Sequence, residues 1–138
     1  MPLSFSHSPT IEDAESAVLV GVELGGANGA IASEDSLGEL EALAESAGAR
    51  IAATVTQKLK RPDPRTFIGR GKVQEVRDLA RERGATLAIF DDALSPAQAR
   101  NLEKELELRV IDRSQLILDI FAQRARTLRA NSRSRSRS

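Results

Sequence analysis

The hydrophobic positions of this 138-residue chain form two kinds of segment that alternate along it. Short apolar runs of strand length occupy Ala17–Val22, Arg50–Gln57, Thr86–Phe90 and Val110-Ile111. After each run, apolar side chains recur every three or four residues, a spacing that places them on one face of a helix. These helical segments begin near Ser36, Lys72, Ser95 and Asp112. The alternation predicts an α/β fold, in which helices flank a small, mainly parallel four-stranded sheet built from βαβα repeats, with strand order 2-1-3-4.

Local signals mark where several of these helices begin and end. Ser95 followed by a proline is typical of a helix start, because serine caps the unpaired N–H groups and proline fits the first turn. Asp112 and Gln115 form a variant of the capping box and predict the start of the last helix. Gly48 is expected to end the first helix, since glycine readily adopts the left-handed conformation.

Three stretches of different composition predict the domain organisation. Residues 1–15 are polar and interrupted by proline, so we expect a disordered leader. Residues 16–127 carry the strand and helix patterns and are expected to form one α/β domain. Residues 128–138 are rich in Arg and Ser, and we expect them to form a disordered tail.

The composition excludes several classes of function. Because the chain has no cysteine, it has no thiol nucleophile, disulfide or cysteine-ligated zinc site, which favours a cytoplasmic setting. The apolar runs are too short to span a bilayer, and the N-terminal residues lack the basic start and apolar core of a signal peptide. The single histidine, His7, falls in the expected leader. We therefore predict no catalytic residue and no metal site.

Charge is distributed unevenly, although 20 basic residues balance 20 acidic ones. Residues 1–45 contain nine acids and no Lys or Arg, whereas residues 124–138 contain six Arg and no acid. Between them, residues 58–72 contain six basic residues and one acid. These segments therefore need separate interpretations.

The basic stretch is the best candidate for a binding site. Its basic residues are Lys58, Lys60, Arg61, Arg65, Arg70 and Lys72. Two prolines stiffen it, so it could grip the phosphates of RNA while Phe67 stacks on a base. We predict these residues to contact RNA or the ribosome; the alternative is a solvated loop.

Two glycine-containing segments resemble phosphate-binding loops only in part. Gly25, Gly26 and Gly29 follow a strand and precede a helix, but their spacing fits neither GxGxxG nor GxxxxGK[ST]. They are an alternative nucleotide-binding candidate, beside the simpler interpretation of a flexible connection. Lys72 is followed by Val73 rather than by the Ser or Thr that holds Mg²⁺ in a P-loop, so the glycines before it more simply allow a sharp turn.

Acidic residues also stand at predicted strand ends, where catalytic acids are often found. They are Asp91, Asp92 and Asp112. No His or Cys accompanies them, and a turn and a helix cap explain their presence without catalysis.

Three segments, taken in order, resemble one known family. Residues 67–73 (FIGRGKV) are similar to the (Y/F)IGxGK(V/L) segment of HflX-type GTPases. Residues 90–103 (FDDALSPAQARNLE) match the family's D(x)xLSPxQxRNLE segment, and residues 110–127 (VIDRSQLILDIFAQRART) match VxDR(T/S)xLILDIFAxRAxT. Over residues 16–127 the chain therefore resembles the N-terminal domain of this ribosome-associated family, truncated before the GTPase domain.

The resemblance implies a domain of a larger GTP-binding protein. Family members bind GTP with Mg²⁺, associate with the large ribosomal subunit and its RNA, and are implicated in splitting or rescuing ribosomes. The family continues from the α/β domain into a helical hairpin and a Ras-like GTPase domain. No residue of this chain matches the family's P-loop, switch segments or base-reading motif. We therefore expect no cofactor and no GTP hydrolysis in this chain.

The sequence departs from the family after Thr127, where the family has a segment like xEGxLQVELAQL. Back-translation of Ala130–Ser138 with permitted codons, read from the third base, gives QLQVALAQ, which is close to that segment. We hypothesise that the tail is a frameshifted remnant of the hairpin, which the coding DNA would test. The alternatives are an Arg/Ser tail that binds RNA electrostatically and a stand-alone small α/β protein that binds a nucleotide or RNA.

Overall fold

The computed structural model describes residues 15–24 and 29–137, with side chains described over 15–24 and 36–125. In chain order the elements are β1 (Ser16–Leu24), α1 (Gly29–Ser46), β2 (Arg50–Leu59), α2 (Arg70–Arg83), β3 (Leu87–Phe90), α3 (Pro96–Leu106), β4 (Arg109–Asp112) and α4 (Arg113–Arg137). All strand pairs are parallel and the sheet order is β2-β1-β3-β4. The predicted α/β class and strand order are therefore confirmed.

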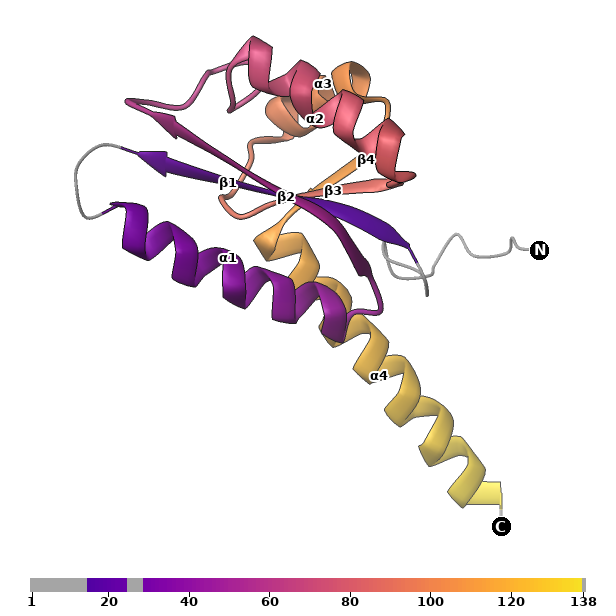
Figure 1. Ribbon diagram of the computed structural model, residues 1–138. Coiled ribbons are helices and arrows are strands. Elements are labelled where there is room, and N and C mark those ends of the chain that lie inside the picture. The colour runs from indigo at the N-terminus through magenta and orange to yellow at the C-terminus, as the bar shows by residue number, and fades with distance from the viewer. Residues whose placement is uncertain (1–14, 25–28, 138) are drawn as a thin grey trace.

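The helices cover both faces of the sheet (Figure 1). Val20 and Phe90 point toward α2 and α3 and belong to one buried cluster, which includes Leu102. Leu19 and Ile89 point to the opposite face, where α1 and α4 form a second buried cluster. Successive strand residues face opposite sides of a sheet, so β1 and β3 must be apolar at nearly every position. This double burial explains the continuous apolar runs in the sequence.

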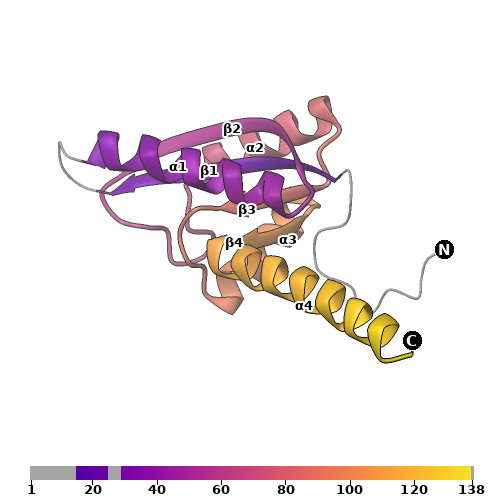
Figure 2. The same cartoon turned by 90° about the horizontal axis from the view of Figure 1, so that it is seen from below.

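Helix α1 begins at Gly29, earlier than the predicted start near Ser36. It lies close against β1 because Gly21 has no side chain: a Cβ at that position would lie 2.9 Å from Leu37 Cγ. Figure 2, seen from below, shows α1 and α4 in front of the sheet, and the Gln123 side chain of α4 donates to the Ala47 carbonyl, 2.9 Å away. The two helices thus form one layer.

The pairing of β1 with β2 is interrupted by an irregularity at Ala52. The register shifts between Ala17 and Val18, so Ala52 has no partner on β1. Its carbonyl accepts a hydrogen bond of 3.0 Å from Arg83 in the last turn of α2. This contact satisfies a backbone oxygen of edge strand β2 and ties that strand to the helix layer above it.

Helix α4 starts at the predicted cap, because the Gln115 N–H donates to Asp112 Oδ1 at 3.0 Å. Its helical backbone continues to Arg137, whereas the sequence predicts a disordered tail over residues 128–138. No glycine or proline follows the helix start to end it, which is the physical reason for the difference. The expected leader lies outside the described residues except for Glu15, whose carbonyl accepts from Arg50 N. The predicted domain limits and the frameshift origin of the tail remain predictions.

Candidate nucleic-acid interface

The predicted basic stretch forms the connection from the carboxyl end of β2 to the start of α2. In Figure 1 this connection lies at the edge of the molecule, beside the layer of α2 and α3. Lys58 lies near the end of β2, whereas Lys60, Arg61 and Arg65 lie in the connection. Arg70 is the first residue of α2.

The segment Asp63–Phe67 forms a tightly closed loop, which we call the basic loop. Two backbone hydrogen bonds join its ends: Asp63 N donates to Phe67 O at 2.9 Å, and Phe67 N donates to Asp63 O at 2.8 Å. Inside the loop, Asp63 Oδ1 accepts from the N–H groups of Arg65 and Thr66 at 2.7 and 3.2 Å. The polar groups of this exposed turn are thus mostly paired, which restricts its motion.

Phe67 does not offer a base-stacking surface, so that part of the prediction is wrong. Its side chain is 6% exposed and belongs to the core cluster beneath α2 and α3. Its backbone has a φ of 67°, a conformation that bulky side chains rarely adopt. Burial of the large ring favours this arrangement, since it removes much apolar surface from water and anchors the basic loop to the core.

Helix α3 also holds the basic loop, through side chains that bind its backbone. Gln98 Nε2 donates to the Asp63 carbonyl at 2.9 Å, and Asn101 Nδ2 donates to the Arg65 carbonyl at 3.0 Å. Arg65 Nη2 also forms an ion pair with Glu105 Oε2 at 3.0 Å. These α3 residues share one helical face, next to the buried face of the same helix. Their polar spacing along α3 was the only signal of this role in the sequence, and it does not reveal which surface they face.

The start of α2 adds a second positive feature beside the basic loop. The Gly69 N–H donates to Gln57 Oε1 at 3.0 Å, and no side chain caps the helix start. The first N–H groups of a helix carry a partial positive charge, which favours anions. Arg65 and Arg70 line one hollow between the basic loop, α2 and α3, together with the carboxylates of Asp63 and Glu105, and its volume is about 220 Å³.

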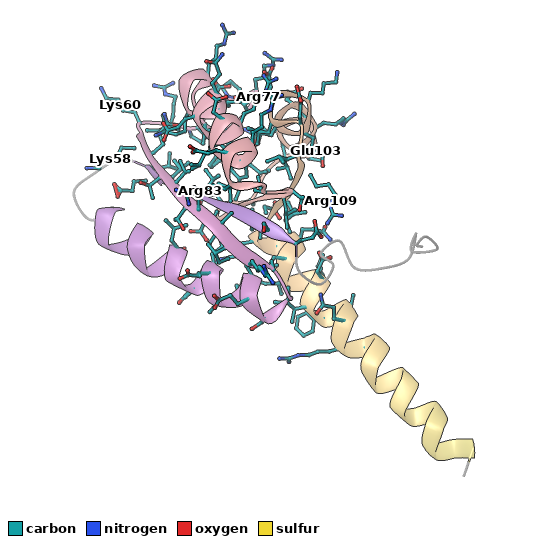
Figure 3. All side chains as sticks on the ribbon, turned by 45° about the vertical axis from the view of Figure 1, so that its right-hand side comes forward. Lys58, Lys60, Arg77, Arg83, Glu103 and Arg109 are labelled. Carbon is teal, nitrogen blue, oxygen red and sulfur yellow. The ribbon has the colours of Figure 1, made fainter. Side chains whose placement is uncertain are left out.

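The six basic residues differ in how available they are. Within the described part of the chain, no carboxylate lies within ion-pairing distance of Lys58, Lys60, Arg61 or Arg70, and all four are exposed. Figure 3 shows Lys58 and Lys60 directed away from the body at the end of β2. Lys72 is the least available, because its side chain is 20% exposed and pairs with Glu75 at 3.0 Å.

The alternative nucleotide site is only partly within the described residues. Gly25 and Gly26 lie outside them, and Gly29 is the first residue of α1. Helix α1 follows β1 and α3 follows the adjacent strand β3, and the two helices cover opposite faces of the sheet. The carboxyl ends of β1 and β3 therefore form the topological switch point, where ligands commonly bind. That candidate therefore remains a prediction.

The carboxylates at this switch point have structural partners. Asp91 accepts a hydrogen bond from Ser36 Oγ and lies 3.1 Å from Arg113 Nε. Asp112 caps α4 and also accepts from Leu94 N at 2.9 Å. Burial raises the pKa of the Asp92 carboxyl, and the Asp91 charge adds to the rise while Arg113 opposes it. Among the described residues, no three His, Cys, Asp or Glu side chains form a group that could hold a metal.

Comparison with known proteins identifies the family. Residues 34–122 match the family model described as GTP-binding GTPase N-terminal. The chain is 52% identical to GTPase HflX of Escherichia coli (strain K12) over 93 residues, which is 67% of this chain and 22% of that protein. It is 44% identical to GTPase HflX of Alkalihalophilus pseudofirmus over 115 residues, or 83% of this chain and 27% of that one. The chain belongs to the GTP-binding GTPase N-terminal family, and it spans about a quarter of the length of these curated relatives.

Solved structures support the fold. The crystal structure of SsGBP in complex with GDP superposes with a TM-score of 0.61 at 24% identity, covering 79% of this chain and 29% of that one. A GTP-binding protein from Sulfolobus solfataricus in complex with GDP gives a TM-score of 0.58 at 22% identity, covering 78% and 30%. In the described part of the present chain, no helix is long and apolar enough to cross a membrane.

Proposed function

We propose that this chain is the RNA-contacting domain of an HflX-type GTP-binding protein, and that it docks on ribosomal RNA of the large ribosomal subunit. The observation that carries the proposal is the set of exposed, unpaired cations beside a closed loop and an uncapped helix start. They are Lys58, Lys60, Arg61 and Arg70. In the full-length protein, this docking would serve GTP-dependent splitting or rescue of ribosomes.

The basic surface suits the sugar–phosphate backbone better than the bases. Sequence-tolerant binding of single strands depends on aromatic side chains that stack on successive bases. Phe67 is buried, and the exposed aromatic Phe121 belongs to α4, in the layer on the opposite face of the sheet. Point charges and helix N–H groups contact phosphates instead. We therefore expect binding to structured RNA with little dependence on base sequence.

GTP binding and hydrolysis are proposed to reside in parts of the full-length protein beyond this chain. The phosphates of GTP and their Mg²⁺ are commonly held by a GxxxxGK[ST] loop, and this sequence contains no such loop. The alternative is a stand-alone domain that binds a nucleotide at the switch point. The negative charges of Asp91 and Asp92 there disfavour a phosphate, so RNA contact is the better-supported function.

The salt dependence of binding tests the proposal. Binding of purified chain to large ribosomal subunits would be measured over a range of salt concentrations for Lys60→Ala/Arg61→Ala and for a control, Arg50→Ala/Arg124→Ala. Both double variants lose the same charge, but Arg50 and Arg124 lie away from the basic surface. We expect the slope of log K against log salt to fall by about 0.7–0.9 for each lost phosphate contact in the first variant only. Equal slopes in both variants would contradict the proposed site.

A further inference from the structure

We infer that Asn101 and Gln98 of α3 are positioning residues for RNA binding, because they hold the basic loop in its binding conformation. The inference rests on the proposed function of the basic surface. Neither residue carries a charge that could attract phosphate. Each instead donates its amide N–H to a backbone carbonyl of the loop, Asp63 for Gln98 and Arg65 for Asn101.

The loop has a physical need for such support. A bulky residue in the left-handed conformation is strained and persists only where the surroundings hold it, and Phe67 has this conformation. Phe67 anchors one end of the loop to the core, whereas the exposed Arg65 lies in its middle. Asn101 binds the loop at this middle residue, and Gln98 binds it at the opposite end, Asp63. A loop held at these three points keeps Arg65 near the hollow that it shares with Arg70.

Helix α3 is a rigid support, since Ser95 caps it and Leu102 and Leu106 are buried on its inner face. Gln98 links the basic loop to the start of α3 through a single amide group. Its Oε1 accepts from Ser95 N at 3.0 Å and completes the capping box, while its Nε2 donates to Asp63 O. The conformation of the loop is therefore coupled to the start of α3.

Loss of either contact should lower the fraction of molecules whose loop has the binding conformation, without removing a charge. When only a fraction of molecules holds the binding conformation, the apparent Kd rises by the inverse of that fraction. The contacts made in the complex are unchanged, so the number of neutralised phosphates is unchanged as well. Replacement of a positioning residue should therefore weaken binding by the same factor at every salt concentration, whereas replacement of a phosphate-contacting residue changes the salt slope.

The test uses Asn101→Ala and the bulkier Asn101→Leu, because both remove the donor without changing charge or the cap of α3. Arg70→Ala serves as the charge-loss comparison. We expect both Asn101 variants to bind large ribosomal subunits more weakly, by up to about 12-fold, the factor that one hydrogen bond is worth, with the salt slope of the original chain. Arg70→Ala should lower the slope. An Asn101 variant that lowers the slope as Arg70→Ala does, or that leaves affinity unchanged, would overturn the inference.

Amide hydrogen exchange separates failure of the inference from failure of the proposed function. The Phe67 N–H is bonded within the loop to Asp63 O, so its exchange should accelerate in both Asn101 variants while the N–H groups of β1 and β3 stay protected. Unchanged Phe67 exchange would overturn the inference even if binding to the subunits is real. If the unmodified chain does not bind the subunits at all, the proposed function fails, and the positioning role fails with it.

Discussion

Replacement of Gly21 by alanine tests how closely α1 lies against the sheet. Gly21 is in β1, and an added Cβ would lie 2.9 Å from both Cγ and Cδ1 of Leu37 and 3.0 Å from its Cδ2. Carbon atoms in contact are ordinarily about 3.5–4.0 Å apart. Rotation about the Cα–Cβ bond of Leu37 would move all three atoms, but this side chain is buried and packed against other core residues. We therefore expect Leu37 and the helix that carries it to move away by roughly 0.5–1 Å.

The expected cost follows from this overpacking. Extra methyl groups in a well-packed core usually destabilise by about 1–3 kcal/mol. For a domain of this size each kcal/mol lowers Tm by about 4 °C, so Gly21→Ala should melt roughly 4–12 °C lower. Gly38→Ala is the matched control, since Gly38 lies in the interior of α1 and its added Cβ would meet nothing within 4 Å. That variant should gain about 0.5–1 kcal/mol, because alanine loses less backbone entropy in a helix.

Thermal unfolding followed by circular dichroism measures both variants. The expected result is a shift of opposite sign for the two Gly→Ala changes. If Gly21→Ala melts at or above the temperature of the original chain, then α1 does not approach β1 as closely as the structure indicates. If Gly38→Ala is also destabilised, the effect of Gly21→Ala is not a consequence of its contact with Leu37.

Two further predictions concern α4 and the switch point. Leu116 is fully buried, so Leu116→Ala should cost about 2–5 kcal/mol, whereas Phe121 is 62% exposed and Phe121→Ala should cost less than about 1 kcal/mol in urea unfolding. Equal costs would mean that another surface covers Phe121 in solution. Asp92→Asn should stabilise the fold near neutral pH by about 0.5 kcal/mol or less, because burial and the neighbouring Asp91 raise the pKa of Asp92 in the folded state. Above its usual value of 3.8 the folded chain then binds more protons than the unfolded one, so the ionised carboxyl is a cost that disappears as pH falls through the raised pKa. A stability difference that grows toward acid pH would refute this assignment.

The sequence alone determined the class of fold and the positions of several helix ends. Strands β1 and β3 are apolar at successive positions because both faces of the sheet are covered, and that pattern can be read locally. Helix caps are equally local, since Ser95 and Asp112 bond to N–H groups three residues further along the chain. The motifs that resemble HflX-type GTPases also predicted the family to which the chain belongs.

Only the tertiary structure decided which residues of the basic stretch face solvent and what holds them in place. Phe67 looked available for stacking because local sequence does not reveal which side of a loop enters the core. The contacts of Gln98, Asn101 and Glu105 with the basic loop join residues 35, 36 and 40 positions apart. Such contacts depend on how α3 packs beside the β2–α2 connection. Neither the hydrophobic periodicity nor the helix and strand propensities of the sequence contain that information. The sequence indicated where the charges are, and the packing of distant elements determined how they are presented.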